Sequence, residues 1–351
     1  MIIVMQPGAT ERDVAEVVQR LGDVGVDVHV SRGRGQTIIA AFGDRAQVER
    51  LPLQAMPAID RVVPTNRAHR FVSREWQRQP SVVMVAGRVP VGGGYFTAIA
   101  GPCAVETEEY LLLSARAVAA AGATLLRGDA FKPRTSPYAF QGLGEAGLKM
   151  LATARAETGL PFIAEVLDPR DVELVSSYAD IVRVGTRNMQ NFTLLTELGR
   201  QPKPVMLKRG FTATIDEWLL AAEYIYKEGN HDVILCERGI RTYEPATRNT
   251  LDISAVPVSK ELSHLPIVID PSHSAGLREA VAPLARAAVA VGADGFMVDV
   301  HPEPERALCD GPQALLPAEF ALLMDDVRRL MEALGLKDPA LALPSPGGVQ
   351  P

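Results

Sequence analysis

One pattern dominates the middle of the chain: short apolar runs recur eight times between residues 96 and 299, and a helical pattern follows most of them. The apolar runs lie at residues 96–100, 124–127, 161–165, 180–184, 204–208, 233–237, 266–270 and 295–299. Eight nearly continuous apolar strands separated by helices are typical of a (β/α)8 TIM barrel. The alternative, a doubly wound sheet, has fewer repeats and a glycine-rich turn that opens a helix, whereas Gly92–Gly94 precede a strand. We therefore expect an α/β barrel over residues 82–336, with 82–91 as a hairpin arm.

A different pattern occupies residues 1–65. Strands are predicted at 2–5, 26–30, 37–42 and 59–63, and helices after Thr10, a plausible N-cap, and at 45–51. The order βαββαβ is that of a small ferredoxin-like domain. The polar residues 66–81 follow as a linker, with one short helix expected around 73–77, and the Pro- and Gly-rich tail 337–351 is expected to be disordered.

The bulk composition excludes several classes of protein. With 36 basic and 42 acidic residues the net charge is −6, which offers no general attraction to nucleic acid or to an anionic membrane. No apolar stretch approaches the roughly twenty residues of a membrane span, and residues 1–6 lack the basic leader of a signal peptide. Three widely spaced cysteines make no disulfide framework, so we expect a cytoplasmic protein.

Cations gather where the predicted barrel strands end. The strand at 124–127 ends in Arg127, and Lys132 and Arg134 follow within a few residues. The complete set is Arg127, Lys132, Arg134, Arg187, Lys208 and Arg238. Active sites of such barrels lie at the carboxyl ends of the strands, and clustered cations repel one another unless an anion binds between them. The sequence therefore predicts a site for phosphorylated substrates at this end of the barrel.

A second group of strand-end residues suits a divalent metal. Cys103, His273, Asp299 and Asp310 offer a thiolate, an imidazole and two carboxylates. A buried cysteine is more often a small core residue, but Cys103 follows Pro102 at a strand end, which favours a ligand. Glu165 has two interpretations, a catalytic role or a supporting one in which it balances a neighbouring cation. Metal, cations and phosphates together suggest Lewis-acid activation of a carbonyl group.

The motifs resemble those of the 3-deoxy-D-arabino-heptulosonate 7-phosphate (DAHP) synthases, in the subtype related to 3-deoxy-D-manno-octulosonate 8-phosphate synthase. They run in order from Gly101 to Gln313: GPCAVE, LRGDAFKPRTSPYAFQGLG, GTRNMQNF, PVMLKRG, ILCERGIRTYE, TRNTLD, DPSHSAG and DVHPEPERALCD. Residues 1–65 resemble the ferredoxin-like regulatory domain of some members. The resemblance implies a metal-dependent transferase that condenses phosphoenolpyruvate (PEP) with erythrose 4-phosphate, the first step of the shikimate pathway. It also implies one divalent metal (manganese, iron, zinc, cobalt or similar), a homo-oligomer, by resemblance a tetramer, and feedback inhibition by tyrosine or phenylalanine.

The resemblance assigns roles residue by residue. The metal ligands fall on Cys103, His273, Asp299 and Asp310, and the PEP contacts on Arg127, Lys132, Glu165, Arg187, Lys208 and Arg238. The erythrose 4-phosphate contacts fall on Lys132, Pro133, Arg134, Thr135 and Ser136. Lys132 is the expected proton donor to the aldehyde oxygen, with His273 or a metal-bound water as alternatives.

The chain departs from the family pattern at three positions. Asp299 stands where the family has Glu, Asp129 where it has Gly, and Thr186 where it has Ala. Asp299 puts the preferred metal in question, and Asp129 places a negative charge in the PEP loop. Two alternatives remain at this point: an eight-carbon synthase that uses arabinose 5-phosphate, against which the Lys-Pro-Arg-Thr-Ser run argues, and a catalytically silent effector-binding protein.

Overall fold

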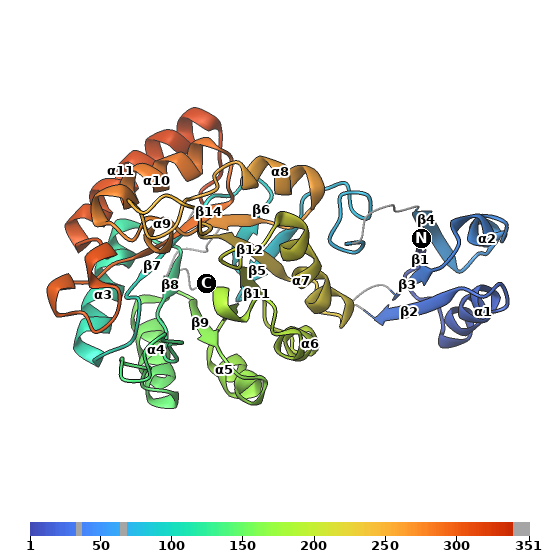
Figure 1. The fold of residues 1–351 in the computed structure, drawn as a ribbon, viewed down its shortest axis with the longest axis horizontal. Coiled ribbons are helices and arrows are strands. Elements are labelled where there is room, and N and C mark those ends of the chain that lie inside the picture. Colours follow the sequence, from blue (N-terminus) through green and yellow to red (C-terminus); the bar gives the residue numbers. More distant parts are fainter. Residues whose placement is uncertain (33–36, 64–68, 340–351) are drawn as a thin grey trace, which may run out of the picture.

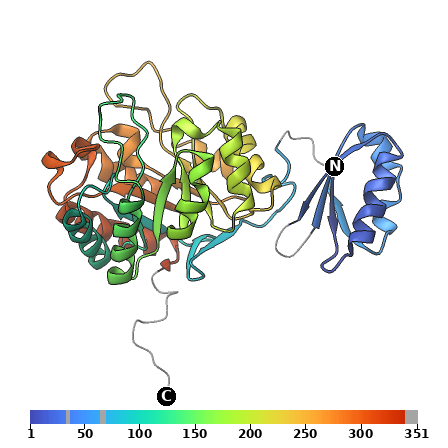
Figure 2. The same ribbon diagram turned by 90° about the horizontal axis from the view of Figure 1, so that it is seen from below.

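The computed structural model describes residues 1–32, 37–63 and 69–339. It shows a small four-stranded unit beside a large closed barrel (Figures 1 and 2). The fold class expected from the sequence, a TIM barrel preceded by a ferredoxin-like domain, is confirmed. Residues 64–68 of the predicted linker and 340–351 of the predicted tail lie outside the described residues. Among the helices of the described part, none combines the length and the apolar character that crossing a membrane requires.

The N-terminal unit has the βαββαβ order that the sequence predicts. Its elements are β1 (Ile2–Met5), α1 (Glu11–Gly22), β2 (Asp27–Arg32), β3 (Thr37–Phe42), α2 (Arg45–Glu49) and β4 (Ile59–Val63). The antiparallel sheet has the order β2-β3-β1-β4. Thr10 caps α1 through a capping box with Asp13, as its position before the apolar pattern indicates. Figure 2 shows both helices on the face of the sheet that points away from the barrel.

The barrel closes through eight parallel strands. They are β7 (Thr97–Gly101), β8 (Leu125–Arg127), β9 (Phe162–Val166), β10 (Ile181–Val184), β11 (Val205–Lys208), β12 (Val233–Glu237), β13 (Ile267–Ile269) and β14 (Gly295–Asp299). The main surrounding helices are α3 (Glu108–Ala121), α4 (Glu145–Thr158), α5 (Val172–Tyr178), α6 (Phe192–Arg200), α7 (Ile215–Lys227), α8 (Ala255–Leu262), α10 (Arg278–Ala290) and α11 (Pro317–Leu334). Strand β14 pairs with β7 from Gly295↔Thr97 to Asp299↔Gly101, which closes the ring.

A hairpin seals one end of the barrel. It consists of β5 (Val82–Val85) and β6 (Val89–Gly92), as the sequence suggests for residues 82–91. Its buried valines form one apolar cluster with inward residues from all eight strands, including Ile99, Met206 and Met297. Because this apolar plug fills the interior from the amino ends of the strands, the polar groups at the carboxyl ends face the open mouth.

The segment ahead of the hairpin is bound to the barrel along its length. The Glu223 carboxylate on α7 accepts the backbone N–H groups of Arg70, Phe71 and Val72 at 3.0, 2.8 and 3.1 Å. The short helix expected around 73–77 is absent, and these residues form turns and an isolated bridge from Ser73 to Ser263. Its hydrogen bonds are divided between local turns, such as the Trp76 N–H to the Ser73 carbonyl at 3.1 Å, and distant partners on the barrel such as Glu223, so no continuous helical run forms.

The open face of the small sheet packs on this same segment. Ile2, Val4, Ile38 and Ala40 belong to one apolar cluster with Phe71 and Trp76. Arg70 donates to the Ala41 carbonyl at 2.8 Å and stacks over the Phe42 ring. His29 contacts the Lys227 carbonyl at the end of α7 at 3.2 Å. The small unit therefore rests against the flank of the barrel in this arrangement.

Candidate active site

A pocket of about 300 Å³ opens at the carboxyl ends of the barrel strands. Its wall contains most of the residues singled out in the sequence: Lys132, Pro133, Arg134, Thr135, Ser136, Glu165, Arg187, Lys208, Arg238, His273 and Asp310. It also contains residues that were not singled out, namely Arg183, Phe211 and Arg248. Cations and carboxylates from seven segments thus meet around one cavity.

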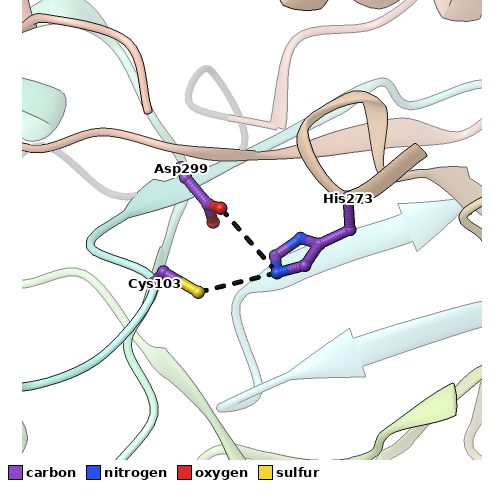
Figure 3. Close-up of side chains that lie close together, drawn as sticks. All are labelled: Cys103, His273 and Asp299. Atoms are coloured by element: carbon purple, nitrogen blue, oxygen red, sulfur yellow. Dashed lines mark hydrogen bonds and ion pairs between the residues drawn. The ribbon is translucent and has the colours of Figure 1, made fainter. Parts of the chain in front are cut away.

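The four expected metal ligands converge beside this pocket. Cys103 follows β7, His273 lies on the short helix α9 (Pro271–Ala275), Asp299 ends β14, and Asp310 precedes a 3-10 turn. His273 Nε2 lies 3.5 Å from Cys103 Sγ and 3.8 Å from Asp299 Oδ2 (Figure 3). It also lies 3.4 Å from Asp310 Oδ2. Cys103 Sγ lies 3.3 Å from Asp310 Oδ2.

These donor atoms fit a divalent metal. Ligand atoms about 2.0–2.3 Å from a tetrahedral metal lie roughly 3.3–3.8 Å from one another. The separations above match this spacing, and Cys103, His273 and Asp299 are buried. Asp270 fixes the imidazole from behind, since His273 Nδ1 lies 2.9 Å from its Oδ2, which turns Nε2 toward Cys103. Burial lowers the pKa of His273, but the carboxylates of Asp270 and Asp299 outweigh burial and raise it to about 10.

Asp299 is held by protein donors on both of its oxygens. Arg127 forms an ion pair with Oδ1, and the Gln313 side-chain amide donates to Oδ2 at 2.6 Å. Asp299 and Arg127 are both completely buried. The carboxylate that the sequence assigns to the metal therefore also neutralises a cation that the sequence assigns to PEP.

A buried carboxylate also stands among the PEP cations. Oδ2 of Asp129 accepts from Arg127 at 2.7 Å, from Lys132 at 2.8 Å and from Arg183 at 2.6 Å. Burial raises the pKa of Asp129, but the three cations, led by Arg183, lower it far below its ordinary value. They therefore keep Asp129 ionised. The same contact raises the pKa of Lys132 against the effect of its burial.

Arg183 is the main residue that the sequence analysis missed. It interrupts the apolar strand β10 and points into the barrel mouth, where its guanidinium also pairs with Glu165 Oε2 at 2.5 Å. This contact supports the interpretation of Glu165 as a group that balances a cation. A charged residue inside an otherwise apolar barrel strand is the signal that could have identified it.

The other three expected PEP cations have different kinds of hydrogen-bond partner. Lys208 forms an ion pair with Asp270, and Arg238 donates to the His273 carbonyl at 2.8 Å. Burial lowers the pKa of Arg238 to about 10. Arg187 contacts the Thr135 hydroxyl at 3.2 Å and is exposed at the rim, where its guanidinium stacks over the Phe211 ring.

The loop from Lys132 to Ser136 forms the outer wall of the pocket. Lys132 is buried and reaches inward to within 3.3 Å of Cys103 Sγ, whereas Thr135 and Ser136 are exposed. Arg134 also lines the pocket. The loop thus reaches from the expected metal ligands in the interior to the solvent-exposed rim of the pocket.

Cys309, directly ahead of Asp310, faces the same donor group. Its Sγ lies 3.7 Å from Cys103 Sγ. The hydrogen bond between the two thiols raises the pKa of Cys103, which burial raises further, and lowers the pKa of Cys309. The two thiols titrate as a pair. When the first proton leaves, the thiolate that forms accepts a hydrogen bond from the other thiol, so the first proton leaves more easily than the second.

Comparison with known families matches both units of the chain. The model of the DAHP synthetase I family matches residues 73–333, and that of the DAHP synthase ferredoxin-like domain matches residues 1–67. A phospho-2-dehydro-3-deoxyheptonate aldolase from Thermotoga maritima is 49% identical over 337 residues, covering 96% of this chain and 99% of the relative. A 2-dehydro-3-deoxyphosphooctonate aldolase from Syntrophotalea carbinolica is 36% identical, covering 67% of this chain and 91% of the relative.

Solved structures show the same likeness. The crystal structure of a Thermotoga maritima DAHP synthase superposes with a TM-score of 0.77 at 48% identity, covering 96% of this chain and 98% of that chain. A truncated form of the Thermotoga maritima enzyme superposes with a TM-score of 0.72 at 51% identity, covering 76% of this chain and 98% of that chain.

Proposed function

Because this chain belongs to the DAHP synthetase I family, we propose that it condenses PEP with erythrose 4-phosphate to give DAHP and phosphate, the first step of the shikimate pathway. The observation that carries the proposal is a cation-lined pocket that opens directly beside a group of cysteine, histidine and aspartate donors. Two phosphorylated substrates need the cations, and an aldehyde that must accept a carbon nucleophile needs polarisation.

Cys103, His273, Asp299 and Asp310 would hold a divalent metal ion such as manganese, iron, zinc or cobalt, which when bound polarises the aldehyde oxygen as a Lewis acid. Asp270 supports this arrangement because it holds the His273 ring with Nε2 directed at Cys103. Since both ring nitrogens of His273 are then engaged, His273 is a poor proton donor. Lys132, charged and 3.3 Å from Cys103 Sγ, is the better one.

The cations of the pocket place the two substrates. Lys132, Lys208 and Arg238 line the inner part, and the completely buried Arg127 donates to the same Cys103 carbonyl as Lys132; these cations suit the carboxylate and phosphate of PEP. Arg134 and the exposed Thr135 and Ser136 form the outer wall, which suits the phosphate of erythrose 4-phosphate. This placement brings the PEP methylene carbon and the aldehyde carbon together near Cys103 and Lys132.

The bonds then change in a balanced sequence. The enol π electrons of PEP form the new carbon–carbon bond, and Lys132 gives a proton to the aldehyde oxygen. Water adds to the phosphate-bearing carbon of PEP, one of its protons restores the charge of Lys132, and the other leaves with the phosphate. Breaking the bond from that carbon to the phosphate oxygen releases inorganic phosphate and leaves the ketone of DAHP. No covalent bond to the protein is required.

Phosphate release from PEP tests the proposal directly. The protein is stripped with a chelator, reloaded with single metals, and offered erythrose 4-phosphate or arabinose 5-phosphate. We expect release with erythrose 4-phosphate only after metal is returned, and loss of release in Lys132→Ala. Preference for arabinose 5-phosphate would instead favour the eight-carbon reaction, and no release with either would support the silent effector-binding alternative.

The N-terminal unit is proposed to regulate this reaction. None of its described residues lines the pocket, and its sequence matches the ferredoxin-like domain of DAHP synthases. We expect tyrosine or phenylalanine to bind it and stabilise an arrangement that blocks the barrel mouth, within a homo-oligomer, by resemblance a tetramer. A coupling of about 1–3 kcal/mol would give several-fold to about hundredfold inhibition. Removing residues 1–65 should abolish inhibition and preserve turnover, and inhibition that persists would place the effector on the barrel.

A further inference from the structure

Cys103 belongs to two groups of potential metal donors. One is Cys103, His273 and Asp299, and the other is Cys103, Cys309 and Asp310. Cys309 is buried and immediately precedes Asp310, and no role in the proposed reaction uses its thiol. Its Sγ nevertheless faces the Cys103 Sγ at 3.7 Å, inside the donor group.

The backbone at this point is bent in an unusual way. Asp310 has φ 53 and ψ 30, a left-handed conformation that side chains other than glycine seldom adopt, and it is one of two such residues in the described part of the chain. Successive side chains normally diverge, yet here both Cys309 Sγ and Asp310 Oδ2 lie within 3.7 Å of Cys103 Sγ. Strain that brings adjacent donors to one point is the kind of outlier that marks a functional site.

Both carboxylate oxygens of Asp299, by contrast, already accept from protein groups. Arg127 and Gln313 each bind one of its oxygens, and its Oδ2 is the most distant of the donors measured from His273 Nε2, at 3.8 Å. A metal ion that bound Asp299 would have to share its oxygens with these two groups. The thiol of Cys309 has only the neighbouring Cys103 thiol as its hydrogen-bond partner among the described residues.

We propose that Cys309 is a direct ligand of the metal in this protein, so that the site holds two sulfur donors and prefers thiophilic ions such as zinc over manganese. This inference rests on the proposed function, which supplies the metal. Two sulfurs about 2.3 Å from one ion, with a near-tetrahedral angle between the two bonds, lie roughly 3.8 Å apart, close to the distance between Cys103 and Cys309. Soft thiolate ligands favour zinc, whereas carboxylates suit manganese.

Cobalt substitution tests the number of sulfur ligands. Metal-free full-length protein receives one equivalent of cobalt(II), and the near-ultraviolet thiolate-to-cobalt absorption is recorded. We expect Cys309→Ser to lose about half of this absorption, because one of two cobalt–sulfur bonds is removed. Cys236→Ala is the matched control, since Cys236 is buried in the barrel interior away from the donor group and its loss should change nothing. Competition with a chelator should show zinc affinity falling by about tenfold or more in Cys309→Ser, and manganese affinity little changed.

The wild-type protein alone can overturn the inference. X-ray absorption of the zinc-loaded protein should show two sulfur neighbours, so the result does not depend on whether Cys309→Ser folds. A single sulfur neighbour, or an unchanged cobalt spectrum in folded Cys309→Ser, refutes the role of Cys309 even if the enzyme is active. A protein that binds neither ion refutes it too. Two sulfur neighbours in a protein that releases no phosphate from PEP would refute only the proposed function.

Discussion

Replacing Asp129 by asparagine should make the protein less stable and its PEP affinity higher. One oxygen of the Asp129 carboxylate accepts hydrogen bonds from Arg127, Lys132 and Arg183, and Asp129 is completely buried. Asparagine keeps the shape and one acceptor oxygen but removes the charge. The three cations then lose a shared counter-ion, while their remaining carboxylate partners are Asp299 and Glu165.

The magnitude follows from the burial of this cluster. Removing one partner of a buried ion pair costs about 3–5 kcal/mol of unfolding free energy, because the other charge stays buried without compensation. A bound anion can replace the missing charge. At an effective dielectric constant of about 20, one unit charge at about 4 Å is worth up to about 4 kcal/mol. Allowing for desolvation of the anion, we expect PEP to bind tenfold to hundredfold more tightly, or about 1.4–2.7 kcal/mol.

Unfolding experiments with and without PEP measure both effects. The denaturation midpoint of Asp129→Asn should be low without ligand and should rise with PEP by more than that of the wild type. Asp294→Asn is the matched control, since Asp294 is buried and pairs with Lys260 at 2.9 Å outside the pocket. It should lower stability without changing the response to PEP. Equal responses to PEP in Asp129→Asn and the wild type would refute the view that Asp129 competes with substrate.

Three further outcomes are expected. Asp299→Glu should remain active and change the order of activation by manganese, zinc and cobalt, because the longer side chain alters the reach of the carboxylate; an unchanged order would argue against Asp299 as a ligand. Hydrogen peroxide should inactivate the metal-free protein by oxidising Cys103 and Cys309 to a disulfide, while the peroxide is reduced to water. Bound metal should protect the two thiols. Peptide mapping that finds no such disulfide would contradict this expectation. Burial lowers the pKa of His264 to about 4, so His264 stays neutral in the folded state, whereas in the unfolded chain it takes up a proton below about pH 6.5. The contribution of His264 to the free energy of unfolding should therefore be fully present above pH 6.5 and fall by about 3 kcal/mol toward pH 4. Urea titrations should show a smaller fall in His264→Gln, and an equal fall would exclude this histidine as a source.

The barrel could be predicted almost completely from the sequence. Its strands are buried on both faces, so each reads as a nearly continuous apolar run, broken inside the strand only by groups such as Arg183 that face the site, and the observed bounds of β7 to β14 agree with the predicted runs to within about a residue. The segment around residues 73–77 could not be predicted in this way. Its local pattern is compatible with a helix, but its partners, Glu223 and Ser263, come from distant parts of the chain.

Most members of the candidate site were predictable, with Arg183 as the main exception, but the pairing of their charges was not. Strand ends of one barrel must meet at one mouth, so Cys103, His273 and Lys208 could be expected near one another. Which carboxylate binds which cation depends on side-chain direction, which no spacing rule supplies. Asp129 was recognised as a departure from the family pattern, but its contact with Arg183 required the folded barrel, because the two residues lie on different strand ends.

The charges of the pocket form two layers, and this separates the two substrates. In the inner layer Arg127, Lys132 and Lys208 each have a carboxylate partner already. In the outer layer Arg134 and Arg187 have no carboxylate within ion-pair distance among the residues that the structure describes. An anion entering the inner layer must therefore compete with protein carboxylates for these three cations, whereas Arg238 donates to the His273 carbonyl and an anion at the rim meets cations without a carboxylate partner. Removing the charge of Asp129 should consequently change PEP affinity far more than erythrose 4-phosphate affinity, because only the inner layer contains Asp129.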